Sequence, residues 1–224
     1  MIPPAAGLIL QHGASEPPGL LEQWLRGRGH EFTVHHSGQG PPPDPRGYAF
    51  IASLGSERSA LDADPPWIPE HIELLRDAVT ADVPALGICF GGQALSLALG
   101  GGSDLASTRE VGWIDVDSHD EIIPVGPWAQ YHDEVMRVPP GARLLARSPA
   151  GTAAYRIGPH LGVQFHPEAT PEMVNAWARA DSNLPAAGIT VDQLADQGLR
   201  YGAAARDCSF ALFDAWWRVG AGAG

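Results

Sequence analysis

Hydrophobic and polar positions divide the first half of the chain into short apolar runs alternating with amphipathic segments. The runs at residues 7–11, 31–35, 48–54 and 84–88 are typical of strands, and residues 41–45 form a Pro-rich loop. Between the runs, residues 18–26 place Leu20, Leu21, Trp24 and Leu25 on one face of a helix, and residues 69–80 predict another. This alternation predicts an α/β fold with a doubly wound, mostly parallel sheet flanked by helices.

The pattern changes after residue 100. Short apolar runs at residues 112–116, 121–123, 130–132, 142–146 and 153–156 predict antiparallel strands on or beside the main sheet, a small β extension. Residues 161–165 predict one more buried strand. Thr170 and Pro171 predict the N-cap and first turn of a helix that ends near residue 180. Two further helices are expected near residues 191–206 and 207–219.

No linker or internal repeat interrupts these segments. We therefore expect one domain over residues 1–224, with C-terminal helices at residues 185–220 whose role the pattern leaves open. A chain of 224 residues, 44% hydrophobic and 18% charged, suits a single α/β domain with a sizeable core.

The most informative segment is Gly87-Ile88-Cys89-Phe90-Gly91, which joins a predicted strand to a predicted helix. This is the layout of a nucleophile elbow, with the reactive side chain at the turn. The flanking glycines allow a sharp turn and remove side chains that would block a substrate. A cysteine at a helix N-terminus is favoured as the thiolate, so Cys89 is the candidate nucleophile. The alternative is a buried structural thiol.

A base for this nucleophile follows the strand predicted at residues 161–165. His166 and Glu168 then lie at the carboxyl edge of the sheet, where open α/β sheets place their sites. Cys89 would attack, His166 would transfer protons, and Glu168 would orient and polarise His166. Alone, His-Pro-Glu could equally be a surface turn.

Charge and cysteine content exclude several classes of function. The net charge of −12 argues against a nucleic-acid or anionic-membrane partner. The N-terminus has no basic segment before its short apolar run, and no run could span a bilayer, so we expect a cytoplasmic protein. Cys89 and Cys208 are the only cysteines, and we expect both to be reduced, although a disulfide between them is the alternative.

Together, the elbow through Gln93 and the segment Gln164-Phe165-His166-Pro167-Glu168 resemble the glutaminase domain of class I, or triad, glutamine amidotransferases. The resemblance is greatest to stand-alone proteins similar to the glutaminase domain of GMP synthase. It extends from the first strand to about residue 177. One departure is the loop Leu54-Gly55-Ser56-Glu57, where the family commonly has Gly-Gly-Pro or Asn-Gly-Pro.

The resemblance implies a reaction and roles for further residues. Cys89 would form a γ-glutamyl thioester from L-glutamine, and the backbone N–H groups of Gly55 and Phe90 would hold the oxyanion. The substrate-binding positions would be Gln93, Glu57, Tyr131, Asp133 and Glu134. No cofactor or metal is implied. Ammonia would pass to a separate synthase or ligase.

Two other functions stay open at this point. One is a hydrolase of other γ-glutamyl amides or peptides that uses the same three residues. The other is a non-catalytic binding or regulatory module on this fold. His12, which follows the first strand, either faces the site or is a satisfied loop residue. Trp216 and Trp217 either pack a helix or form a partner surface.

Overall fold

A computed structural model describes residues 6–220 and shows an eight-stranded sheet in the order β2-β1-β3-β4-β10-β9-β8-β6. Its parallel part comprises β2 (Phe32–His36), β1 (Gly7–Gln11), β3 (Ile51–Ser53), β4 (Ala85–Ile88) and β10 (His160–Val163). Antiparallel strands β9 (Gly151–Ile157), β8 (Arg143–Ser148) and β6 (Asp117–Ser118) extend one edge. The predicted α/β class with a mostly parallel sheet is confirmed.

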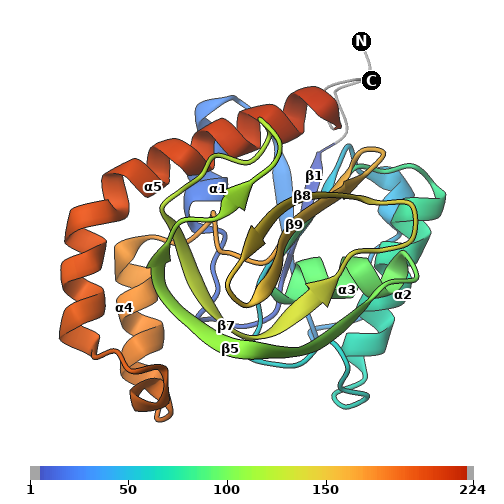
Figure 1. The fold of residues 1–224 in the computed structure, drawn as a ribbon. Helices are drawn as coiled ribbons and strands as arrows, with labels where there is room; N and C mark the ends of the chain where they lie inside the picture. The colour runs from blue at the N-terminus through green and yellow to red at the C-terminus, as the bar shows by residue number, and fades with distance from the viewer. Residues whose placement is uncertain (1–5, 221–224) are drawn as a thin grey trace.

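A separate antiparallel pair, β5 (Gly102–Ile114) and β7 (Trp128–Arg137), forms the small β extension in front of the main sheet in Figure 1. The helices are α1 (Gly19–Gly27), α2 (Trp67–Thr80), α3 (Phe90–Ala98), α4 (Pro171–Ala180) and α5 (Val191–Val219). Short 3₁₀ turns cover Pro45–Gly47 and Leu184–Ala187. Thr170 caps α4 as predicted, since its side chain accepts a hydrogen bond from the backbone N–H of Met173.

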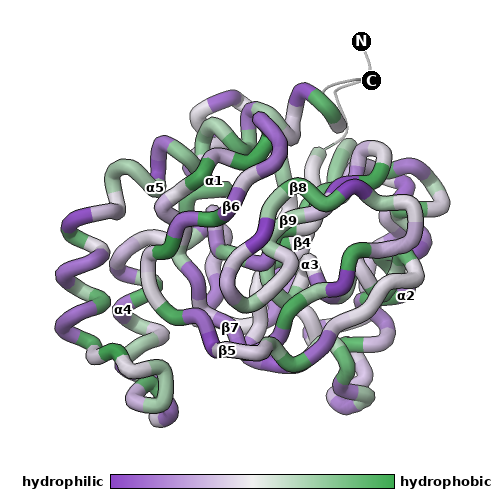
Figure 2. The backbone as a smooth tube through the Cα atoms, viewed as in Figure 1, coloured by the Kyte–Doolittle hydropathy of each residue, from purple (hydrophilic) through white to green (hydrophobic). Residues whose placement is uncertain are grey.

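Alternate residues of the parallel strands bury on opposite faces of the sheet, as the pleat requires. Ile9 of β1 packs in a cluster with Trp24 of α1 and Trp216 of α5. Its neighbours Leu8 and Leu10 pack in a second cluster with residues of α2 and α3. The sheet is therefore covered on both sides, and Figure 2 shows hydrophobic and hydrophilic residues alternating along the covering helices.

Two predicted elements differ in the structure. Residues 121–123 form a turn rather than a strand. Asp120 accepts hydrogen bonds from the backbone N–H groups of Ile122 and Ile123, and both isoleucines are buried in the core. The two isoleucines are therefore apolar because they are buried within a turn that starts at Asp120, and they do not form a strand.

The expected pair of C-terminal helices is also wrong, because residues 191–219 form the single helix α5. A capping box of Thr190 and Gln193 starts it, and no proline or glycine follows residue 202 until its end. Figure 1 shows α5 changing direction as it passes from α4 to the top of the sheet. Trp216 is fully buried, so it serves helix packing.

A third cluster joins α4 and α5 to the β5–β7 pair. It includes Trp113 of β5, Ala129 of β7, Val174 of α4 and Leu194 of α5. The long C-terminal helix thus packs in this cluster at one end and on the main sheet at the other. Within residues 6–220, no helix has the length and apolar character needed to cross a membrane.

Candidate active site

Cys89 lies between β4 and α3 in a backbone conformation that few residues adopt. Its φ of 51° and ψ of −110° are outside the regions favoured by residues with a side chain. Such strain at the junction of a strand and a helix is characteristic of a nucleophile elbow. The side chain is nearly buried, with 6% of its surface exposed, and it lines a cavity.

The glycines of the elbow are required by close backbone contacts. A Cβ atom on Gly87 would lie 2.4 Å from the carbonyl oxygen of Gly91, and one on Gly91 would lie 2.2 Å from that of Ser53. A Cβ on Gly92 would lie 2.7 Å from the carbonyl oxygen of Val163. These glycines therefore let α3 start against β3 and β10.

The Gly91 contact predicts a large loss of stability in Gly91→Ala. The added methyl group meets backbone atoms that cannot move aside, so the free energy of unfolding should fall by at least about 2 kcal/mol. Urea unfolding measures the change. Gly27→Ala is the matched control, because nothing lies within 4 Å of its new methyl group and alanine favours a helix. Equal stability of the two variants would contradict the prediction.

His166 and Glu168 lie beyond the end of β10, next to the elbow. His166 Nδ1 is 2.7 Å from Glu168 Oε1, and the backbone N–H of His166 donates to the carbonyl of Ala129 on β7. Glu168 is fully buried, and its carbonyl accepts a hydrogen bond from the backbone N–H of Leu20 at the start of α1. Both side chains are therefore fixed by neighbouring elements.

The pKa of His166 is raised well above its usual value. Burial opposes the charged imidazolium, but the Glu168 carboxylate and then the charge and hydrogen bond of Cys89 outweigh it. This direction favours the protonated imidazole of His166, which lies between a carboxylate and a thiol. A cation beside a cysteine stabilises its thiolate form.

Gln164 is a site residue to which the sequence analysis assigned no role. Its Nε2 lies 3.6 Å from Cys89 Sγ, and its Oε1 accepts hydrogen bonds from Gln93 Nε2 and the backbone N–H of Met136. It is fully buried. The alternation of an extended chain was the available signal, because Gln164, His166 and Glu168 are spaced two residues apart.

Gly55, the expected oxyanion residue, lies against both catalytic candidates. A Cβ atom there would be 2.8 Å from His166 Cε1 and 3.9 Å from Cys89 Cβ. Phe90 is the first residue of α3, where backbone N–H groups lack partners within the helix. The two backbone positions named for the oxyanion thus flank Cys89.

The cavity beside Cys89 has a volume of about 440 Å³, within the usual range for small-molecule sites. Most expected site residues line it, and Glu168 and Gly55 are not among the lining residues. The expected residues in the lining are Glu57, Cys89, Phe90, Gln93, Tyr131, Asp133, Glu134 and His166.

The side chains predicted to bind substrate on β7 have other partners. The Tyr131 hydroxyl donates to Asp181 (2.8 Å), Asp133 pairs with Arg109 (2.8 Å), and Glu134 accepts from the hydroxyl of Ser103 (3.0 Å). A contact with substrate through these residues would therefore use their backbone groups.

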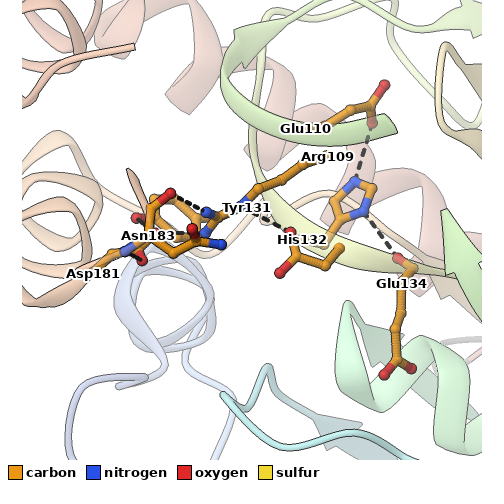
Figure 3. Close-up of polar contacts among 8 residues, drawn as sticks. Arg109, Glu110, Tyr131, His132, Glu134, Asp181 and Asn183 are labelled. Atoms are coloured by element: carbon orange, nitrogen blue, oxygen red, sulfur yellow. Dashed lines mark hydrogen bonds and ion pairs between the residues drawn. The ribbon is translucent and has the colours of Figure 1, made fainter. Parts of the chain in front are cut away.

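Arg109 of β5 ties the segment after α4 to the β5–β7 pair (Figure 3). It bonds Asp181 at 2.5 Å and the carbonyl oxygen of Asn183 at 2.9 Å, and its guanidinium lies over the ring of Tyr131. Asp181 and Arg109 both line the cavity. This network was not predicted, because it joins residues more than 70 positions apart in the sequence.

His132, beside these residues, is buried between oxygen atoms. Its Nδ1 is 2.9 Å from the Glu134 carbonyl, and its Nε2 is 3.1 Å from the Glu110 carboxylate (Figure 3). Burial would raise the pKa of Glu110, but the hydrogen bond and charge of His132 help to lower it below its usual value. The Glu110–His132 pair therefore links β5 to β7 and has a structural role.

His12 does not line the cavity beside Cys89, and its ring nitrogens contact the hydroxyls of Ser37 and Ser53. It is a satisfied loop residue. Cys89 and Cys208 are both free, so the disulfide alternative is excluded. Within residues 6–220, no group of three His, Cys, Asp or Glu side chains is arranged to hold a metal ion.

Comparisons with known proteins agree with this geometry. The family model for glutamine amidotransferase class-I matches residues 59–176. GMP synthase (glutamine-hydrolyzing) of Xylella fastidiosa is 31% identical over 135 residues, which cover 54% of this chain and 25% of that protein. The corresponding protein of Alkalilimnicola ehrlichii is 34% identical over 140 residues, with the same coverage. The chain thus matches about a quarter of the length of these relatives.

Two solved structures extend the likeness to the whole fold. A glutamine amidotransferase from Methylobacillus flagellatus has a TM-score of 0.87 and 28% identity, and the match covers 96% of this chain and 95% of that one. A glutamine amidotransferase structure from Thermotoga maritima has a TM-score of 0.85 and 21% identity, and the match covers 95% of this chain and 97% of that one. At this identity the match supports the fold alone. The chain belongs to the class I glutamine amidotransferase family and is similar to part of GMP synthase.

Proposed function

We propose that this protein hydrolyses the side-chain amide of glutamine through a γ-glutamyl thioester on Cys89. The observation that supports this most is the fixed constellation at the sheet edge. A strained Cys89 lies beside His166, whose pKa is raised and whose Nδ1 is 2.7 Å from the carboxylate of the buried Glu168. A nucleophile, a proton carrier and a group that orients the carrier are the parts that such a mechanism needs.

In the first half-reaction, the Cys89 thiolate attacks the carboxamide carbon. The backbone N–H groups of Gly55 and Phe90 would stabilise the oxyanion as it forms. His166 donates its proton to the departing nitrogen, the C–N bond breaks, and ammonia leaves a C–S thioester behind. In the second half-reaction, neutral His166 takes a proton from water, and the hydroxide displaces Cys89 to form glutamate.

Substrate recognition would involve Gln93, Glu57 and the backbone around Tyr131, Asp133 and Glu134, all of which line the cavity. We infer that the ammonia serves a separate synthase or ligase, because the relatives that this chain resembles include glutamine-hydrolysing GMP synthases. We also infer one domain for residues 1–224, because α5 packs in two of the hydrophobic clusters.

The thioester itself provides the test. The protein is mixed with glutamine and quenched in acid within milliseconds to seconds, and its peptides are analysed by mass spectrometry. We expect a γ-glutamyl mass increase on the peptide with Cys89 and none on the peptide with Cys208, whose thiol pKa is raised by burial and which lies outside the cavity. In the same samples, the amount of ammonia should equal the sum of free glutamate and the γ-glutamyl adduct. Ammonia release without an adduct in any quench, or an adduct on both cysteines, would contradict the mechanism.

A further inference from the structure

Glu16 is a buried carboxylate in the cavity that the thioester mechanism does not use. It lies in the loop between β1 and α1, has only 9% of its surface exposed, and lines the same cavity as Cys89 and His166. A buried charge is costly unless a partner of opposite charge or several hydrogen bonds compensate it. Glu16 therefore needs an explanation.

The local structure holds Glu16 in place without neutralising it. Its Oε1 accepts a hydrogen bond from the Ser15 hydroxyl at 2.7 Å, and a Cβ atom on Gly13 would lie 2.1 Å from its Oε2. The indole N–H of Trp177 donates to the Ser15 carbonyl at 2.7 Å, while the Trp177 ring packs 4.9 Å from the ring of His166. Among residues 6–220, no lysine or arginine forms an ion pair with Glu16.

The negative charge of Glu16 is only partly compensated by its neighbours. Burial raises its pKa, and the carboxylates of Glu57 and Glu168 add to this effect. The hydrogen bond from Ser15 and the positive charge of His166 act in the opposite direction. Glu57 comes from a different loop and lines the same cavity. Two carboxylates therefore face a shared space. Two arginines also line it, Arg58 and Arg109, and Arg109 is paired with Asp133 and Asp181. Within residues 6–220, neither arginine forms an ion pair with Glu16 or Glu57, and the positive charge that acts on Glu16 is that of His166.

The position of Glu16 identifies which end of a substrate it would meet. The residues proposed for the glutamyl end, Gln93 and the β7 segment, come from α3 and β7. Glu16 comes instead from the loop after β1, and Trp177 joins this loop to the site, because its ring packs against His166 while its indole N–H donates to the Ser15 carbonyl. His166 protonates the departing nitrogen. Glu16 therefore borders the space for the leaving group.

We propose that this cavity accepts γ-glutamyl amides in which the amine that leaves also carries an ammonium group at its far end, as in a monoacylated diamine. Glu16 binds that ammonium group. The inference rests on the proposed thioester chemistry and extends its substrate class. The amide C–N bond breaks, the C–S bond to Cys89 forms, and the proton of His166 goes to the departing amine. Water then releases glutamate, as it does with glutamine.

A matched pair of substrates tests the role of Glu16. The first is γ-glutamyl-(4-aminobutyl)amide, and the second is γ-glutamyl-n-pentylamide, in which a methyl group replaces the ammonium group. We expect the unmodified protein to favour the charged substrate at least about tenfold in kcat/KM, as a charge-assisted contact provides. Glu16→Gln should reduce kcat/KM for the charged substrate about tenfold or more and for the pentylamide less than about threefold. Glu121→Gln, at an exposed glutamate outside the cavity, should change neither.

The outcomes separate this inference from the proposed function. If Glu16 only supports His166, Glu16→Gln lowers activity on both substrates by the same factor, and the inference fails. It fails equally if the unmodified protein prefers the pentylamide, a result that does not depend on how the variant folds. If the unmodified protein and Cys89→Ala release no amine or ammonia from either amide or from glutamine, the proposed function itself fails.

Discussion

Replacing Cys89 with alanine is expected to lower glutamine hydrolysis by about 10³-fold or more, to the level of the uncatalysed background of the assay. The thioester cannot form without the sulfur atom, and neighbouring groups that merely bind substrate do not replace a lost nucleophile. His166 and Glu168 would remain in place but would have no group to activate. Ammonia release, coupled to a dehydrogenase that consumes ammonia, measures the effect.

The fold should survive this change. Alanine keeps the Cβ atom of Cys89, and the thiol packs in the first hydrophobic cluster, with polar contacts among residues 6–220 only to Gln164 and His166. We therefore expect the thermal midpoint of Cys89→Ala to lie within a few degrees of that of the unmodified protein. Cys208→Ala is the matched control and should retain full activity. Normal activity in Cys89→Ala would exclude the thioester mechanism, and loss of activity in Cys208→Ala would indicate that both variants act through stability.

The position of the elbow followed from the sequence because its determinants are local. A buried strand, two close glycines and the start of a helix occupy residues 84–93, and the structure has β4, Cys89 and α3 there. The position of His166 and Glu168 beside the elbow also followed from one local rule, that parallel strands end at a common edge. Strand periodicity likewise located β1 without error.

The missed features depend on contacts between distant segments. Ile122 and Ile123 are apolar because they lie in the core, and hydrophobicity alone does not separate a buried turn from a strand. Arg109 meets Asp181 only because β5 and the end of α4 come together in space. Glu16 has no motif around it, and its burial beside His166 depends on where Trp177 places the loop. Residues of these kinds appear only when the tertiary structure is known.

Replacing Glu168 with glutamine should lower kcat by about 10²- to 10⁴-fold, because the imidazole loses the charge that orients and polarises it. Glutamine has nearly the same shape, and its carbonyl oxygen can still accept the hydrogen bond from His166 Nδ1. The change therefore removes the negative charge while preserving most of the packing around a fully buried side chain. Asp181→Asn is the matched control, because Asp181 also pairs with a basic side chain at the cavity but does not contact His166.

The pH profile distinguishes this electrostatic role from a loss of structure. In the unmodified protein the Glu168 carboxylate raises the pKa of His166 against the effect of burial. Without that charge, burial acts with less opposition, so His166 loses its proton at a lower pH. The first half-reaction requires protonated His166, and the alkaline limb of kcat/KM for glutamine should therefore move to lower pH in Glu168→Gln. Residual activity with an unchanged alkaline limb would mean that Glu168 supports the fold without setting the protonation of His166, because a structural defect lowers the whole profile without shifting it.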